Sequence, residues 1–380
     1  MKCEFPFHSI AIQPNGDITP CCAFTGSVGK VDDIKTIPIF LDQNEQLKTL
    51  RDNENNGVWT LPSCRLCEST SEETSRKSIF NKTISPYLNT DGLLHTDISF
   101  GNICNLSCAM CTSKYSSKLK QIEKSFKERW LPISDSYELP LDFLDKFGEV
   151  SKDLKLLEIK GGEPLLYPEH LKKLFECISE ECEVNITTNF TQMNDELFDL
   201  LSKIKNLKVF VSIDGVDDTY EWIRGYDFAA VEDKVLKYNS VITRFNYCTS
   251  IFNIGDIENF ITWTKTLNKN IPIAFSLIAK ERHLSPLLSP KKDEVLERLS
   301  KITFDCKKTQ RHFDILKTYL QQEQITDDDS IQKFYSWFAH LGSVRKYRFP
   351  FSNKYYLPEI NYDIQPMRTT LPTVGRTQST

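Results

Sequence analysis

The sequence lacks any apolar run that approaches the roughly 18 residues of a membrane-spanning helix. Its first residues, MKCEFPFHSIAIQPNG, also lack the long apolar stretch of a secretory signal. Basic residues are not in excess, because 47 lysines and arginines stand against 52 aspartates and glutamates, and no basic stripe indicates a nucleic-acid surface. These absences predict a cytoplasmic globular protein with no membrane segment and no nucleic-acid footprint.

Cysteine, by contrast, is abundant, with 12 residues in a chain of 380. Disulfides are rare in a reducing compartment, so clustered cysteines are more often metal ligands or catalytic groups there. Seven of them form two groups along the sequence. One group is Cys104, Cys108 and Cys111, and the other, near the N-terminus, is Cys3, Cys21, Cys64 and Cys67.

The stretch GNICNLSCAMC, residues 101–111, has three cysteines and no fourth. A structural zinc site or a ferredoxin-type cluster takes four protein ligands, which close the coordination sphere. Three thiolates leave one metal position open, as a site that binds and transforms a ligand requires. The alternative interpretation is a zinc site completed by a distant residue, or three incidental thiols.

Six short segments rich in isoleucine, valine and leucine predict strands from residue 95 onward. They are residues 95–100, 154–160, 183–189, 207–214, 246–252 and 271–278. Helical patterns lie between them, at residues 113–130, 167–181, 194–204 and 256–267. This alternation predicts an α/β fold with a parallel sheet, and six units are too few for an eight-unit barrel. An open, partial barrel is expected.

The unusual motifs all follow the predicted strands. The three cysteines come after the first strand, GGEP (161–164) after the second, Asn189 ends the third, and SIDG (212–215) ends the fourth. In parallel barrels the loops after the strands meet at one rim, where the chemistry takes place. The motifs are therefore expected to lie close together.

With this placement, C-x3-C-x2-C resembles the hallmark of the radical S-adenosylmethionine (SAM) superfamily, found after the first strand of a partial (β/α)6 barrel. The residue before the last cysteine is Met110, where the family usually has an aromatic. The resemblance implies a [4Fe–4S] cluster held by Cys104, Cys108 and Cys111, whose open iron binds SAM. An external donor such as flavodoxin or ferredoxin would supply an electron that cleaves SAM to a 5′-deoxyadenosyl radical, which abstracts hydrogen from a substrate.

Two further motifs resemble SAM-binding elements of that family. GGEP matches the element that holds the amino end of SAM, through Gly161, Gly162 and Glu163. VSIDG with the later IRG resembles the fourth-strand region of peptide-modifying members and implies that Ser212 and Asp214 lie near SAM and that Arg224 meets its carboxylate. Ordinary strand-ending turns and surface ion pairs are the alternative interpretation. The sequence identifies no catalytic acid or base.

The N-terminal cysteines resemble the half-length relative of the SPASM domain, called a twitch domain. The matching features are a cysteine before a hairpin, Gly16-x4-Cys21, and a later C-x2-C. The resemblance implies an auxiliary [4Fe–4S] cluster, with Cys22 as an alternative to Cys21; its ligands would be Cys3, Cys21, Cys64 and Cys67. The family commonly has this module after the barrel, whereas here it comes first. A structural zinc bound by four thiolates is the alternative.

Four regions are expected: an auxiliary-cluster module at 1–94, the partial barrel at 95–285, a helical C-terminal extension at 286–364, and a disordered polar tail at 365–380. The predicted activity is that of a radical SAM enzyme, of oxidoreductase type, whose substrate is a peptide or a small molecule. A non-catalytic binding protein on a degenerate barrel, stabilised by zinc or an iron–sulfur cluster, is the rival hypothesis.

Overall fold

The computed structural model describes most of the chain, namely residues 2–58, 61–69, 76–88, 92–126, 132–278 and 281–358. The expected polar tail, 365–380, lies outside these residues, and so does the end of the helix predicted at 113–130. No helix in the described ranges is long and apolar enough to cross a membrane.

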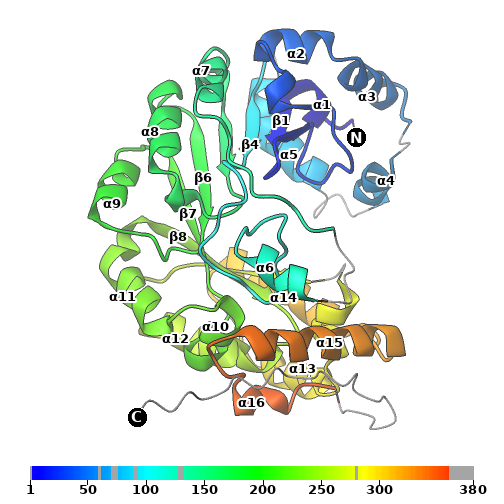
Figure 1. Cartoon of the computed structure of the whole chain (residues 1–380), viewed down its shortest axis with the longest axis vertical. Helices are drawn as coiled ribbons and strands as arrows, with labels where there is room; N and C mark the ends of the chain where they lie inside the picture. Colours follow the sequence, from blue (N-terminus) through cyan, green and yellow to red (C-terminus); the bar gives the residue numbers. More distant parts are fainter. Residues whose placement is uncertain are drawn as a thin grey trace, which may run out of the picture.

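One nine-stranded sheet organises the molecule, in the order β3-β2-β1-β4-β5-β6-β7-β8-β9. From β4 to β9 all neighbouring strands are parallel, as predicted. These six strands are β4 (His95–Ile98), β5 (Leu156–Ile159), β6 (Glu183–Thr188), β7 (Leu207–Ser212), β8 (Ile242–Thr249) and β9 (Ile273–Leu277). Helices cover the outside of the sheet (Figure 1). The predicted α/β class with a partial (β/α)6 barrel is confirmed.

Alternating burial distinguishes the two faces of the sheet. Along β6, Val184 and Ile186 are fully buried, while Asn185 between them is only half-buried. The apolar face packs against helices. Side-chain caps help to fix where these helices begin, as at Asn194, whose side chain accepts from Leu197 N at 2.9 Å. These helices are α7 (Phe143–Gly148), α8 (Pro168–Cys177), α9 (Asp195–Ser202), α10 (Asp217–Arg224), α11 (Phe228–Tyr238) and α12 (Ile257–Thr266). The opposite, concave face is polar.

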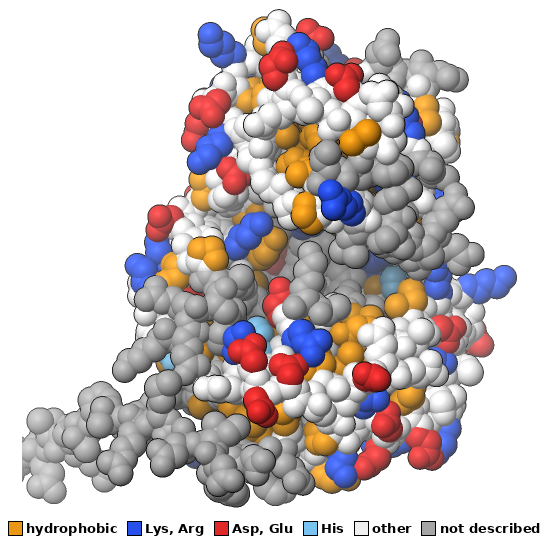
Figure 2. Space-filling view, turned by 90° about the vertical axis from the view of Figure 1, so that its right-hand side faces the viewer, with side chains coloured by type: hydrophobic (Ala, Val, Ile, Leu, Met, Phe, Trp, Pro, Cys, Tyr) orange, Lys and Arg blue, Asp and Glu red, His pale blue; other side chains and the backbone are white. Residues whose placement is uncertain are grey.

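The N-terminal hairpin is part of the same sheet. Strands β1 (Ser9–Ile12) and β2 (Asp17–Thr19) pair antiparallel, as the PNG turn predicts. β1 also pairs in parallel with β4, with Ser9 opposite His95. The rest of the N-terminal region consists of α1 (Phe5–His8), β3 (Gly29–Lys30), α2 (Ile37–Gln43), α3 (Glu45–Asn55), α4 (Pro62–Ser69) and α5 (Arg76–Ile84). Figure 1 shows it at the upper right, beside β4, and Figure 2 shows it at the top of the molecule with both acidic and basic side chains on its surface.

The C-terminal region is helical, as predicted. It consists of α13 (Lys292–Ser300), α14 (Lys307–Leu320), α15 (Asp328–Val344) and α16 (Phe351–Lys354). α14 covers the edge strand β9, where Ile273 N donates to Thr309 Oγ1 at 3.0 Å. α15 runs across the molecule next to α10 and α6 (Figure 1).

The helix α6 (Leu119–Ser125) begins later than the predicted 113. The residues before it form turns instead, because their hydroxyl groups bond to the cysteine loop. Ser116 Oγ donates to Leu106 O at 2.6 Å, and Ser117 Oγ accepts from Cys104 N at 3.4 Å. These side chains compete with helical hydrogen bonding.

Candidate functional site

The loop with Cys104, Cys108 and Cys111, here called the cysteine loop (residues 101–111), follows β4 at the rim of the sheet. Its main chain contacts α10, where Ala109 N donates to Ile223 O at 2.7 Å. At the rim of β6, Asn189 Nδ2 lies 3.9 Å from Cys104 Sγ. The loops after separate strands thus meet here, as predicted.

Burial changes the chemistry of these thiols. Desolvation and the neighbouring Cys108 raise the pKa of Cys104 to about 12, and desolvation also raises the pKa of Cys108 and of Cys111. Without metal the three groups are neutral thiols at pH 7, and only a bound cation would favour the thiolates. No three His, Cys, Asp or Glu side chains in the described ranges converge on one point as placed. Metal binding therefore requires the cysteine side chains to turn toward a common centre.

The glycines of GGEP serve the packing of two loops. Gly161 and Gly162 both have positive φ, +85° and +54°. A Cβ at Gly162 would lie 2.4 Å from Ile103 O, and one at Gly161 would lie 2.3 Å from Ser99 Oγ. Only glycine permits this approach, which brings the GGEP loop against the cysteine loop.

The carboxylate of Glu163 is buried and bonded within the chain. Its Oε1 accepts from Thr188 Oγ1 at 2.5 Å and from Leu165 N at 3.0 Å, and its Oε2 accepts from Asn189 N at 2.7 Å. Burial raises the pKa of Glu163, although these three donors oppose the shift. Because a carboxylate has about four acceptor positions, one remains for an outside donor.

Asp214 and Arg224 form a buried ion pair beside the cysteine loop. Arg224 Nη2 lies 2.6 Å from Asp214 Oδ2, and Cys248 N donates to Asp214 Oδ1 at 2.7 Å. Burial raises the pKa of Asp214 despite the opposing charge of Arg224. Arg224 also bonds to Cys108, and among the described residues its buried Nε has no acceptor. Ser212 ends β7 nearby and is half-buried.

The N-terminal cysteines gather in the region around α1. Cys3, Cys21 and Cys64 line one small cavity, and the charge of Cys67 acts on Cys3. Burial raises the pKa of Cys3, and Glu54 Oε2 accepts from Cys3 N at 3.0 Å. Cys22, the alternative to Cys21, does not line this cavity.

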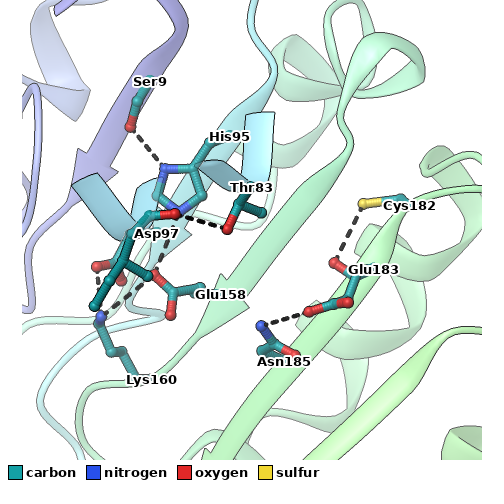
Figure 3. A network of polar contacts seen from close by, with 10 residues as sticks. Ser9, Thr83, His95, Asp97, Glu158, Lys160, Cys182, Glu183 and Asn185 are labelled. Carbon is teal, nitrogen blue, oxygen red and sulfur yellow. Dashed lines mark hydrogen bonds and ion pairs between the residues drawn. The ribbon is translucent and has the colours of Figure 1, made fainter. Parts of the chain in front are cut away.

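A partly buried polar network on the concave face was not predicted from the sequence (Figure 3). Lys160 Nζ lies 2.6 Å from Asp97 Oδ2 and 3.9 Å from Glu158 Oε2. His95 Nε2 is 3.3 Å from Glu158 Oε2, and its Nδ1 is 2.7 Å from Ser9 Oγ of the N-terminal hairpin. The charge of Cys22 acts on Lys160. Polar residues at alternate positions of two predicted strands, 95 and 97 and then 158 and 160, were the available signal.

Comparison with known families agrees with this geometry. Residues 98–269 match the model described as the radical SAM superfamily, and residues 3–68 match SPASM, an iron–sulfur cluster-binding domain. The chain therefore contains a radical SAM domain and a SPASM iron–sulfur domain. Its radical SAM domain implies a [4Fe–4S] cluster and SAM, and its SPASM domain implies an auxiliary cluster.

Similar proteins cover parts of this chain. The sporulation killing factor maturation protein SkfB of Bacillus subtilis is 31% identical over 125 residues, which are 33% of this chain and 27% of SkfB. An uncharacterized protein of Methanocaldococcus jannaschii is 28% identical over 132 residues, 33% of this chain and 41% of that protein. The chain thus matches less than half the length of either curated relative. The structure of Streptococcus suis SuiB bound to its precursor peptide SuiA is similar with a TM-score of 0.39 and 14% identity, over 82% of this chain and 78% of SuiB.

The residues present fit these cofactors. The cysteine loop offers three soft sulfur donors, which iron–sulfur clusters require. Beside them the Nε of Arg224, which has no acceptor among the described residues, is a buried donor that a carboxylate would satisfy. The N-terminal cavity offers the thiols of Cys3, Cys21 and Cys64 to an auxiliary cluster.

Proposed function

We propose that this chain binds a [4Fe–4S] cluster through Cys104, Cys108 and Cys111, binds SAM at its open iron, and oxidises a peptide or protein side chain. The observation that carries the proposal is the meeting of the cysteine loop, the GGEP loop and the Asp214–Arg224 pair at one rim. When bound, the cluster and SAM supply the radical that abstracts hydrogen. The protein itself positions the ligands and excludes water.

Each rim residue has a role in that arrangement. Gly161 and Gly162 allow the GGEP loop to approach the cysteine loop, and Glu163 holds Asn189 while keeping one acceptor position for the ammonium of SAM. Arg224 is fixed by Asp214 and offers its Nε to the carboxylate of SAM. Ser212 ends β7, two residues before Asp214.

The proposed auxiliary cluster takes its ligands from the N-terminal region. Four thiolates close this cluster, so it would accept an electron from the substrate radical rather than bind the substrate. A cytoplasmic location would keep the thiols reduced, and a flavodoxin or ferredoxin would supply the electron that starts the reaction. The ligands are Cys3, Cys21, Cys64 and Cys67.

A peptide is the substrate that the comparisons favour. The 31% identity is to a maturation protein, SkfB, and the residues of SIDG and IRG resemble those of peptide-modifying members. Oxidation in this sense removes two hydrogens from the substrate. One leaves as a hydrogen atom to the adenosyl radical, and the other leaves as a proton, with its electron passing to the auxiliary cluster.

The test uses the reconstituted protein with dithionite, SAM and a peptide encoded beside its gene. Wild-type protein should contain about eight irons per chain and convert the peptide to a product lighter by two hydrogens in mass spectrometry. The Cys64→Ala/Cys67→Ala variant should keep about four irons and still release 5′-deoxyadenosine, but yield no product. An unmodified peptide together with conversion of a sugar alcohol would contradict the peptide assignment.

A further inference from the structure

The helix α15 holds the cysteine loop from the C-terminal side. Trp337 Nε1 donates to Ala109 O at 3.0 Å, and this bond is buried. Ala109 lies between two proposed ligands of the cluster. Further along the same helix, His340 Nε2 lies 2.9 Å from Ile122 O of α6, so α15 contacts the segments on both sides of Cys111.

Arg345, which directly follows α15, enters the same region. Its Nη2 donates to Ser107 O, next to Cys108, and its Nη1 donates to Trp222 O and, at 3.2 Å, to Ile223 O. The guanidinium carbon lies 5.1 Å from the centre of the Trp222 ring. A single side chain therefore links the cysteine loop to the end of α10.

Among the residues that the structure describes, no carboxylate pairs with Arg345. In the described part of the chain its hydrogen-bond partners are all main-chain carbonyls, and its buried Nε has none. The nearby Arg224 differs, because Asp214 neutralises it. An unpaired charge held away from water costs free energy unless an opposite charge offsets it. Cys108 is the group whose charge acts on Arg345.

We propose that Arg345 and Trp337 are positioning residues of the cluster site, and that Arg345 is the counter-ion of the thiolate-bound cluster and raises its reduction potential. This inference rests on the proposed cluster at Cys104, Cys108 and Cys111. A positive charge stabilises the reduced, more negative cluster relative to the oxidised one. It assigns a role to a C-terminal helix that neither family match covers.

The test is a redox titration of the reconstituted full chain, following the EPR signal that responds to added SAM. Arg345→Gln removes the charge but keeps a donor, and its midpoint potential should shift to a more negative value than that of wild type. Arg345→Lys keeps the charge, and its midpoint potential should therefore stay close to that of wild type. Lys346→Gln is the matched control, because it removes one exposed charge at the next residue and should leave the potential unchanged. An Arg345→Gln protein with full iron and the wild-type potential would overturn the proposal.

A second measurement needs no cluster and covers the case of an unstable Arg345→Gln. Trp337→Phe keeps the ring against Phe126 but leaves the carbonyl of Ala109 without its donor. In the metal-free chain, iodoacetamide should then modify the three loop cysteines faster than in wild type, while Cys177 reacts at the same rate. Equal rates at the loop cysteines would refute the positioning role. A wild type with no SAM-responsive signal at all would show that the proposed function is wrong. That result differs from a wild type with the signal whose potential does not depend on Arg345, which would overturn only the role of Arg345.

Discussion

Single atoms decide whether the loops at the rim fit together. Gly162 has room for a hydrogen where any other residue places a Cβ 2.4 Å from Ile103 O. That carbonyl also accepts from Glu163 N at 2.9 Å, so it cannot move without losing a bond. The two loops that carry the proposed cluster and SAM contacts are therefore coupled through one glycine.

Gly162→Ala should therefore destabilise the metal-free protein by at least about 1 kcal/mol. Alanine is strained at the positive φ of this position, and its methyl group would push Ile103 O of the cysteine loop away. Iron uptake on reconstitution should fall with it. Urea unfolding and iron analysis measure both effects.

Gly342→Ala is the matched control for this substitution. Gly342 lies on the exposed side of α15, and no described residue comes within 4 Å of an added Cβ. Alanine should stabilise the helix there by roughly 0.5–1 kcal/mol and leave iron uptake unchanged. Two variants with the same stability would contradict the account of Gly162.

The sequence predicted which residues form the site better than it predicted which residues they contact. The cysteine spacing and GGEP pointed to the rim, where these loops do meet. The sequence could not show that the backbone of Gly161 and Gly162 approaches Ser99 and Ile103, because those contacts join segments about 60 residues apart. The hydrogen bonds of Glu163 with Thr188 and Asn189 could not be predicted either, because they join residues 25 and 26 positions apart.

At the scale of elements, α15 is anchored at its N-terminal half by the turn after β9, Arg282–Leu284, where His283 is buried. Burial, with the charge of Lys333 on α15 adding to it and that of Asp329 opposing it, lowers the pKa of His283 from 6.5 to about 4. In the unfolded chain the ring takes up its proton near 6.5, whereas in the folded chain it does so near 4. The neutral ring therefore contributes stability that is fully present above pH 6.5 and lost as the pH falls toward 4.

Chemical unfolding at several pH values tests this contribution. Between pH 6.5 and pH 4, wild type should lose about 3 kcal/mol that the His283→Gln variant does not lose, since glutamine has no charge to gain. If the two proteins lose stability in parallel over that range, His283 does not carry the effect.

The existence of elements was predictable where a local pattern is strong. Among the described residues, the six strands, the N-terminal hairpin and helices of the C-terminal extension are all present. β8, however, begins at Ile242 rather than 246, because Thr243 and Arg244 are both half-buried at a register shift against β7 and interrupt the apolar alternation. The contacts of α15 with the cysteine loop, through Trp337 and Arg345, arise from tertiary packing that periodicity does not report.

At the scale of the whole molecule, the N-terminal region and the barrel share one sheet. β1 continues the parallel order at β4, and Ser9 meets the His95–Glu158 network on the concave face. The sequence showed two cysteine groups but not this pairing, which joins residues 86 positions apart. The N-terminal hairpin is thus joined to the barrel by main-chain hydrogen bonds, which would hold the proposed auxiliary cluster at a fixed distance for electron transfer.

An open cluster in the cysteine loop, at which SAM is cleaved, underlies the proposed function. The most direct measurement is the release of 5′-deoxyadenosine from SAM by the anaerobically reconstituted protein with dithionite. Wild type should release it, Cys104→Ala should not, and Cys306→Ala, at the start of α14 and outside both cysteine groups, should match wild type. A colourless, zinc-loaded wild type that releases no 5′-deoxyadenosine would contradict the account and favour a metal-stabilised binding protein.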